Sequence, residues 1–183
     1  MKSSFIKSLS TIIAIPLVIL ALTFGIDYQS HANQYPLFYC ALTTLGIHWT
    51  VASISIYLKT EKFFDITGTV AVLSMIYVAI THSYSLSSRA VILASMCCIW
   101  TIRLGIFLLY RVHKHKKDRR FAQIKESKSD FLITWEMSAA WTLITISCAL
   151  CGITSTKKPA INLIDYILII GWLAAFTVEV CAD

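Results

Sequence analysis

The sequence predicts an all-α protein, a polytopic membrane bundle of about six transmembrane helices in which residues 1–183 form a single transmembrane domain. Three observations lead to this prediction. Hydrophobic residues make up 57% of the chain and charged residues only 14%, whereas soluble domains carry about 25% charged residues. The apolar residues occur in runs of about 20, which is the length that crosses the bilayer core as a helix. Lys and Arg are concentrated between these runs rather than within them.

Proline positions help to define the predicted helices. Pro16 predicts a kink within the first helix, whereas Pro36 suits the first turn of the second. Pro159 precedes the last helix. The first apolar run is longer than the 7–15 residues typical of a signal-peptide core, so a retained helix is favoured over a cleaved leader. Short linkers predict that consecutive helices are antiparallel. The predicted helices cover residues 5–26, 36–58, 66–82, 90–110, 131–151 and 161–183.

The positive charge is local. The net charge is +6, and eight of the 16 Lys and Arg residues lie between Arg111 and Lys128. Because this cluster separates two apolar runs, it predicts a basic cytoplasmic loop at residues 111–130 rather than a nucleic-acid site. With the N-terminus in the cytoplasm, twelve Lys and Arg residues lie in cytoplasmic segments and three in outer ones. This topology suits a bacterial cytoplasmic membrane or the endoplasmic reticulum, with membrane lipids as partners.

The six cysteines predict no metal site. Most lie within apolar runs, where cysteine behaves as a small hydrophobic residue. Cys148 and Cys151 form a C-x-x-C pair, but no second pair follows at the spacing of a zinc site.

Two charged residues fall inside predicted helices. From the helical rise, Arg103 lies about 12 Å and Glu136 about 9 Å below the cytoplasmic boundary. Charges at such depths usually pair or line a polar cavity. Arg103 and Glu136 are therefore predicted to pair or to share a cavity. The alternative is that Arg103 extends its side chain to the lipid headgroups.

The last helix carries two further acids, Glu179 and Asp183, whose four-residue spacing places them on one helical face. Asp65 lies at the same side of the predicted membrane. This gathering of ionisable groups predicts a polar pocket, open to the cytoplasm, that could hold a charged cofactor. The simpler reading is that they are ordinary acids at the membrane interface.

His48 and Tyr77 are candidate catalytic residues in the middle of the second and third helices. An imidazole or a phenol could donate a proton to the carbonyl group of an apolar substrate. Alternatively, such residues bond a neighbouring helix.

Several motifs follow one another in an order found in a known family. They are Phe64-Asp65-x-x-Gly68, Trp100-x-x-Arg103-Leu-Gly, the D-R-R-F segment at 118–121, Phe131-x-x-x-Trp135, Gly171-Trp172 and Glu179-x-x-Ala182-Asp183. Over residues 63–183 the chain resembles the steroid 5-alpha-reductase-like membrane family, specifically the branch defined by the steroid reductase C-terminal domain. Sterol reductases and isoprenylcysteine methyltransferases belong to the same superfamily.

The resemblance implies a multi-helix membrane enzyme. In the family's reductases, NADPH enters from the cytoplasm and gives a hydride to an enone-type double bond of an apolar substrate, such as a steroid. Arg103, Glu179 and Asp183 match family positions in the cofactor pocket. Two alternatives remain: a non-catalytic membrane protein that binds lipid or a partner, and a methyltransferase that uses S-adenosylmethionine.

The sequence also departs from the family pattern. Members continue beyond the Ala-Asp pair with an R-H-P-N-Y-type segment that wraps the cofactor, so this sequence looks C-terminally truncated and is expected to bind NADPH weakly or not at all as it stands. Glu136 and Met137 occur where the family often has glutamine. The second helix has no counterpart of the reductases' substrate-contacting glutamate.

Overall fold

A computed structural model describes residues 2–29, 34–83, 85–115, 121–124, 127–157 and 159–183, and these residues form helices and their connections without strands. Six of the helices are long and apolar enough to cross a membrane, which confirms the predicted fold class. A short seventh helix, α5, was not predicted. The helices are α1 (Lys2–Gln29), α2 (Pro36–Leu58), α3 (Phe64–Thr81), α4 (Ser88–His115), α5 (Phe121–Ile124), α6 (Lys128–Thr154) and α7 (Leu163–Ala182).

The predicted basic loop at 111–130 is partly helical. Helix α4 continues to His115 and α6 begins at Lys128, because Lys and Arg are good helix formers and cations suit the last turn of a helix. Most of the D-R-R-F segment lies outside the described residues, and Phe121 begins α5.

Local signals in the sequence account for several helix ends. Tyr35 adopts a positive φ of 44° directly before Pro36, which opens α2. The Ser127 side chain accepts a hydrogen bond from the backbone N–H of Asp130 at the start of α6. Helix α7 starts with a capping box, in which Asn162 and Asp165 each accept a hydrogen bond from the other's backbone N–H.

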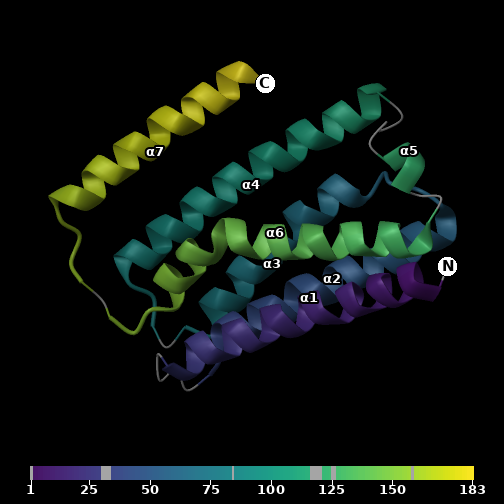
Figure 1. The fold of residues 1–183 in the computed structure, drawn as a ribbon. Helices are drawn as coiled ribbons and strands as arrows, with labels where there is room; N and C mark the ends of the chain where they lie inside the picture. Colours follow the sequence, from purple (N-terminus) through teal and green to yellow (C-terminus); the bar gives the residue numbers. More distant parts are fainter. Residues whose placement is uncertain (1, 30–33, 84, 116–120, 125–126, 158) are drawn as a thin grey trace.

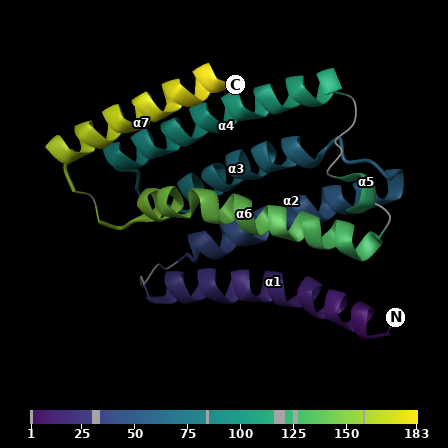
Figure 2. The same cartoon turned by 45° about the horizontal axis from the view of Figure 1, so that its top comes forward.

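Helix α6 lies at the centre of the bundle and contacts α1, α2, α3 and α4. The start of α1, the end of α4, α5 and the start of α6 lie at the same end of the bundle, and α7 runs toward that end (Figures 1 and 2). One apolar core joins α2, α3 and α6 and includes the fully buried Met75 and Leu150. A second core around Trp135 holds α5 against α6 through Phe121 and Phe131.

Helices α3 and α4 approach each other closely at Gly105. A methyl group added at Gly105 would lie 2.6 Å from Thr69 Oγ1 and 2.7 Å from Thr69 Cγ2. Only glycine fits this contact without moving α3 or α4. Small residues of this kind allow close packing of membrane helices.

Helix α7 lies beside α4 at the edge of the bundle (Figures 1 and 2). None of its residues is buried in the protein, although it is among the most apolar helices. Most of its large side chains are exposed, and specific contacts join α7 to α4.

Candidate functional site

Arg103 on α4 is the central residue of the contact with α7. Its Nη1 donates to Glu179 Oε1 at 2.8 Å, and its Nη2 donates to the Glu179 carbonyl oxygen at 3.1 Å. Nη2 also pairs with the carboxylate of Asp183. The guanidinium carbon lies 5.7 Å from the centre of the Phe107 ring, within reach of a cation–π interaction. The site thus contains one cation and two carboxylates.

The predicted pairing of Arg103 with Glu136 is wrong. Arg103 faces α7, whereas Glu136 lines a cavity between α6, α1 and α2. Although α4 and α6 are in contact, the two side chains leave their helices on different faces. The similar predicted depths of Arg103 and Glu136 were therefore not enough to predict that they pair.

Trp100 extends this contact by one helical turn. Its indole Nε1 donates to Glu179 Oε2 at 3.1 Å, so Arg103 and Trp100 engage both carboxylate oxygens. The two donors lie three residues apart on α4 and share a face, as Glu179 and Asp183 do on α7. The structure thus brings together the three residues that the sequence suggested for a cofactor pocket, and it adds Trp100, the first residue of the Trp100-x-x-Arg103-Leu-Gly motif.

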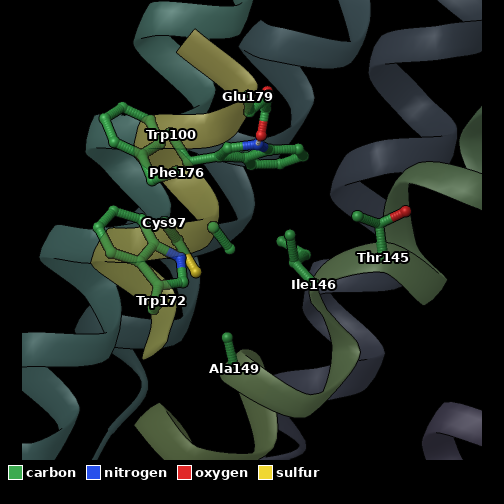
Figure 3. A pocket seen from close by; sticks show the side chains of 9 residues that line it. Cys97, Trp100, Thr145, Ile146, Ala149, Trp172, Phe176 and Glu179 are labelled. Atoms are coloured by element: carbon green, nitrogen blue, oxygen red, sulfur yellow. Dashed lines mark hydrogen bonds between the residues drawn. The ribbon is translucent and has the colours of Figure 1, made fainter. Parts of the chain in front are cut away.

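A crevice of about 260 Å³ lies between α4, α6 and α7, and Glu179 is one of its lining residues. Trp172 and Phe176 contribute rings from α7, with ring centres 5.0 Å apart and nearly parallel planes. Figure 3 shows Cys97 and Trp100 on α4, and Ile146 and Ala149 on α6, lining the same space. The crevice is mainly apolar, and Glu179 is the charged residue among the described residues that line it.

A second cavity, of about 340 Å³, lies between α3, α4 and α6. It shares Trp100 and Thr145 with the crevice, so the two spaces adjoin at these side chains. Asp65, Ser138 and Thr142 add polar groups to its lining.

A second ion pair joins α4 to α7 near the start of both helices. Arg89 Nη2 lies 2.6 Å from Asp165 Oδ2. Asp165 also accepts the backbone N–H of Asn162 at 2.9 Å. Nothing in the sequence pairs these residues, because Arg89 lies in a predicted connection and Asp165 lies within the last predicted helix, 76 residues later.

The two candidate catalytic residues have different surroundings. His48 is fully buried, with Nδ1 at 2.8 Å from the Thr44 carbonyl oxygen and Nε2 at 3.4 Å from Ser138 Oγ. Because Ser138 lines the cavity between α3, α4 and α6, His48 is one contact away from it. Tyr77 is 69% exposed on α3 and lines none of the three cavities described.

At the end of the bundle that holds the basic segment, Arg111 Nη2 pairs with Asp65 Oδ2 at 3.1 Å. This pair connects α4 to α3 and leaves Arg111 partly exposed. Within the described ranges, no group of three or more His, Cys, Asp or Glu residues is placed to hold a metal ion.

Comparison with known proteins identifies the family. The family described as "Protein of unknown function (DUF1295)" matches residues 48–183, which is about three quarters of the chain. The chain belongs to the DUF1295 family. This family is steroid 5-alpha-reductase-like in general. No curated protein and no solved structure matches the chain.

The DUF1295 region contains the whole α4–α7 site. It begins at His48 within α2 and includes Arg103, Glu179 and Asp183, whereas α1 lies before it. The crevice and the adjoining cavity are likewise lined only by residues of the DUF1295 region.

Proposed function

We propose that this DUF1295 protein is a membrane-embedded, NADPH-dependent reductase that saturates the double bond of an apolar enone, such as a steroid or an enone lipid. The observation that carries the proposal is the meeting of Arg103, Glu179 and Asp183 beside an apolar crevice. These are the residues at which the chain resembles the cofactor pocket of steroid 5-alpha-reductase-like enzymes.

The charges of this site limit which part of the cofactor it could hold. One guanidinium and two carboxylates leave a net negative charge, which does not favour phosphate groups. Carboxylate oxygens are acceptors and suit the hydroxyl and amide N–H groups of a dinucleotide. Glu179 and Asp183 would therefore bind those groups, while Arg103 holds both carboxylates in place.

Cations that could bind the phosphate groups of NADPH occur in the segment that follows Arg103 in the sequence. The segment between Arg111 and Lys128 contains eight Lys and Arg residues, and these side chains are the usual partners of phosphate in proteins. This role requires the basic segment to face the cytoplasm, where NADPH is dissolved. We therefore also propose a cytoplasmic N-terminus, in agreement with the positive-inside rule.

The apolar spaces suit the other reactant. The crevice and the adjoining cavity measure about 260 and 340 Å³, and small-molecule sites commonly occupy 300–1,000 Å³. An apolar substrate could enter between α7 and the rest of the bundle, because α7 has no buried residues. Bound NADPH would supply the hydride, and the chain would orient the enone and supply a proton.

His48 is better placed than Tyr77 for this proton. The Nε2 of His48 contacts Ser138, whose side chain borders the cavity. We propose that His48 and Ser138 act together as the proton donor. The Tyr77 hydroxyl belongs to a side chain that is mostly exposed on the outer surface of α3.

The proposal is tested by assaying the protein, isolated from its native membrane and held in lipid nanodiscs, with NADPH and a panel of enone steroids and enone lipids. Consumption of NADPH together with a product heavier by two hydrogens would support a reductase, and Glu179→Gln should reduce the rate while Asp165→Asn should not. Methyl transfer from S-adenosylmethionine to a prenylated cysteine would overturn the proposal in favour of a methyltransferase. Absence of both reactions would favour a non-catalytic lipid- or partner-binding protein.

A further inference from the structure

A third cavity lies on the opposite side of α6 from the proposed cofactor site. It measures about 490 Å³ and lies between α1, α2 and α6. Pro16 and Leu20 line it from α1, Trp49 from α2, and Leu132 and Glu136 from α6. None of its lining residues lines the crevice or the cavity beside Trp100.

Among the described residues that line this cavity, Glu136 is the only ionisable one. Its side chain is 1% exposed, and neither carboxylate oxygen accepts a hydrogen bond with acceptable geometry from the described part of the chain. The indole of Trp49 is near enough to interact with the carboxylate, but this contact does not have the geometry of a hydrogen bond. A buried carboxylate without donors is unfavourable, so the site calls for a donor from outside the chain.

The wall formed by α1 lacks one backbone donor. Pro16 lies inside α1 and has no backbone N–H, so it cannot donate to the carbonyl group of Ile12 one turn earlier. Ile12 and Pro16 both line the cavity. The unpartnered polar group at this cavity is therefore the Glu136 carboxylate, with mainly apolar side chains around it.

We propose that this cavity binds a long-chain primary amine from the membrane, with its ammonium group paired to Glu136. A primary ammonium offers three N–H donors and a positive charge, and the face of the Trp49 indole can also attract it. An alcohol offers only one donor and no charge, and a fatty acid would place two carboxyl groups together. The alkyl chain matches the leucine and isoleucine side chains of α1.

The position of Glu136 explains why the ligand is a lipid-soluble amine. Glu136 lies six residues after Asp130, which corresponds to a depth of about 9 Å along α6. At that depth a small hydrophilic amine would have to leave water, whereas a long-chain amine already dissolves in the bilayer. The site is independent of the proposed reductase activity, since it requires neither NADPH nor the α4–α7 contact.

The test uses a dodecylamine analogue with a photoreactive diazirine in its chain, added to the protein in nanodiscs. After irradiation, mass spectrometry should locate saturable labelling on the α1 segment around Pro16 and on the α2 segment around Trp49. Unlabelled dodecylamine should compete with the probe for this site. Dodecanol should compete at least about tenfold more weakly. NADPH should not compete, which separates this site from the proposed cofactor site.

Two variants complete the test. Glu136→Gln keeps the shape of the side chain but removes its charge, and it should weaken competition by dodecylamine about tenfold. Leu20→Trp keeps Glu136 but fills the cavity, and it should abolish the labelling. Asp65→Asn, at a carboxylate outside this cavity, is the control and should change nothing. Equal labelling of the wild type and both cavity variants, or equal competition by dodecanol and dodecylamine, would overturn the proposal.

Discussion

Arg103 and Glu179 form an ion pair with an Nη1–Oε1 distance of 2.8 Å, although 76 residues separate them in the chain. The pair connects a helix that packs in the bundle with a helix that has no buried residues. Because α7 has no buried residues, we expect its position to depend on the polar contacts at Arg103 and Arg89. The geometry of the proposed cofactor site therefore depends on the same contacts that hold α7.

Exchange of the two charges tests this dependence. Arg103→Glu alone should place three carboxylates together and lower the free energy of unfolding by about 1–3 kcal/mol. The double variant Arg103→Glu with Glu179→Arg should recover at least half of that loss, measured by unfolding in mixed micelles. Pairing Arg89→Glu with Glu179→Arg is the matched control and should give no recovery. A double variant no more stable than the worse single variant would argue against the ion pair.

Asp165 should stabilise the start of α7 in two ways. It pairs with Arg89 and also accepts the backbone N–H of Asn162. Asp165→Asn keeps an acceptor for the cap but removes the charge, and should lower the free energy of unfolding slightly. Asp165→Ala removes both interactions and should lower it further. Hydrogen exchange at the first turn of α7 should increase in the same order, and equal effects of the two variants would show that the cap contributes nothing.

Gly105 should not tolerate even one added methyl group. Because both outer atoms of the Thr69 side chain occupy the required space, rotation of that side chain gives no relief, and Gly105→Ala should cost about 1–3 kcal/mol. Gly171→Ala is the control, because nothing lies within 4 Å of the added atom. That variant should be neutral or up to about 1 kcal/mol more stable. The comparison is made by thermal unfolding, and similar midpoints for the two variants would contradict the close contact of α3 and α4.

Trp135 should be replaceable by another aromatic residue. It is fully buried and packs edge-to-face with Phe64, at 5.0 Å between ring centres. Its indole Nε1 has no acceptor among the described side chains and backbone groups. Trp135→Phe should therefore cost less than about 1.5 kcal/mol, whereas Trp135→Ala should cost about 3–5 kcal/mol. A large loss in the phenylalanine variant, measured by thermal unfolding, would mean that the indole N–H makes an important hydrogen bond.

The helices were predictable because apolar run length alone identifies a membrane span. The ends of the helices were less predictable. Helix α4, for example, extends into the basic segment, where hydropathy falls but helix propensity stays high. Short α5 has no periodic signal, and it depends on the packing of Phe121 against Phe131 and Phe64. Such tertiary contacts are invisible to a reading of local pattern.

The site was predicted in part. The spacing of Glu179 and Asp183 correctly placed both acids on one helical face, and the family resemblance grouped them with Arg103. The pairing of Arg103 with Glu136 failed because depth does not determine the direction of a side chain around its helix. The three-residue spacing of Trp100 and Arg103 was the unused signal: it places two donors on one face of α4, opposite the two acids of α7.

The most direct test of the proposed cofactor site is a titration of NADPH into the protein isolated from its native membrane. For the protein as its native membrane holds it, together with any segment that follows Asp183, we expect saturable binding. Glu179→Gln and Asp183→Asn should each weaken it by about tenfold, since each loses a charged hydrogen-bonding group. Asp165→Asn, which lies at the far end of α7, should keep the affinity within about twofold. Binding that all three variants weaken equally, or no saturable binding by the wild type, would contradict the assignment of Arg103, Glu179 and Asp183 to a cofactor site.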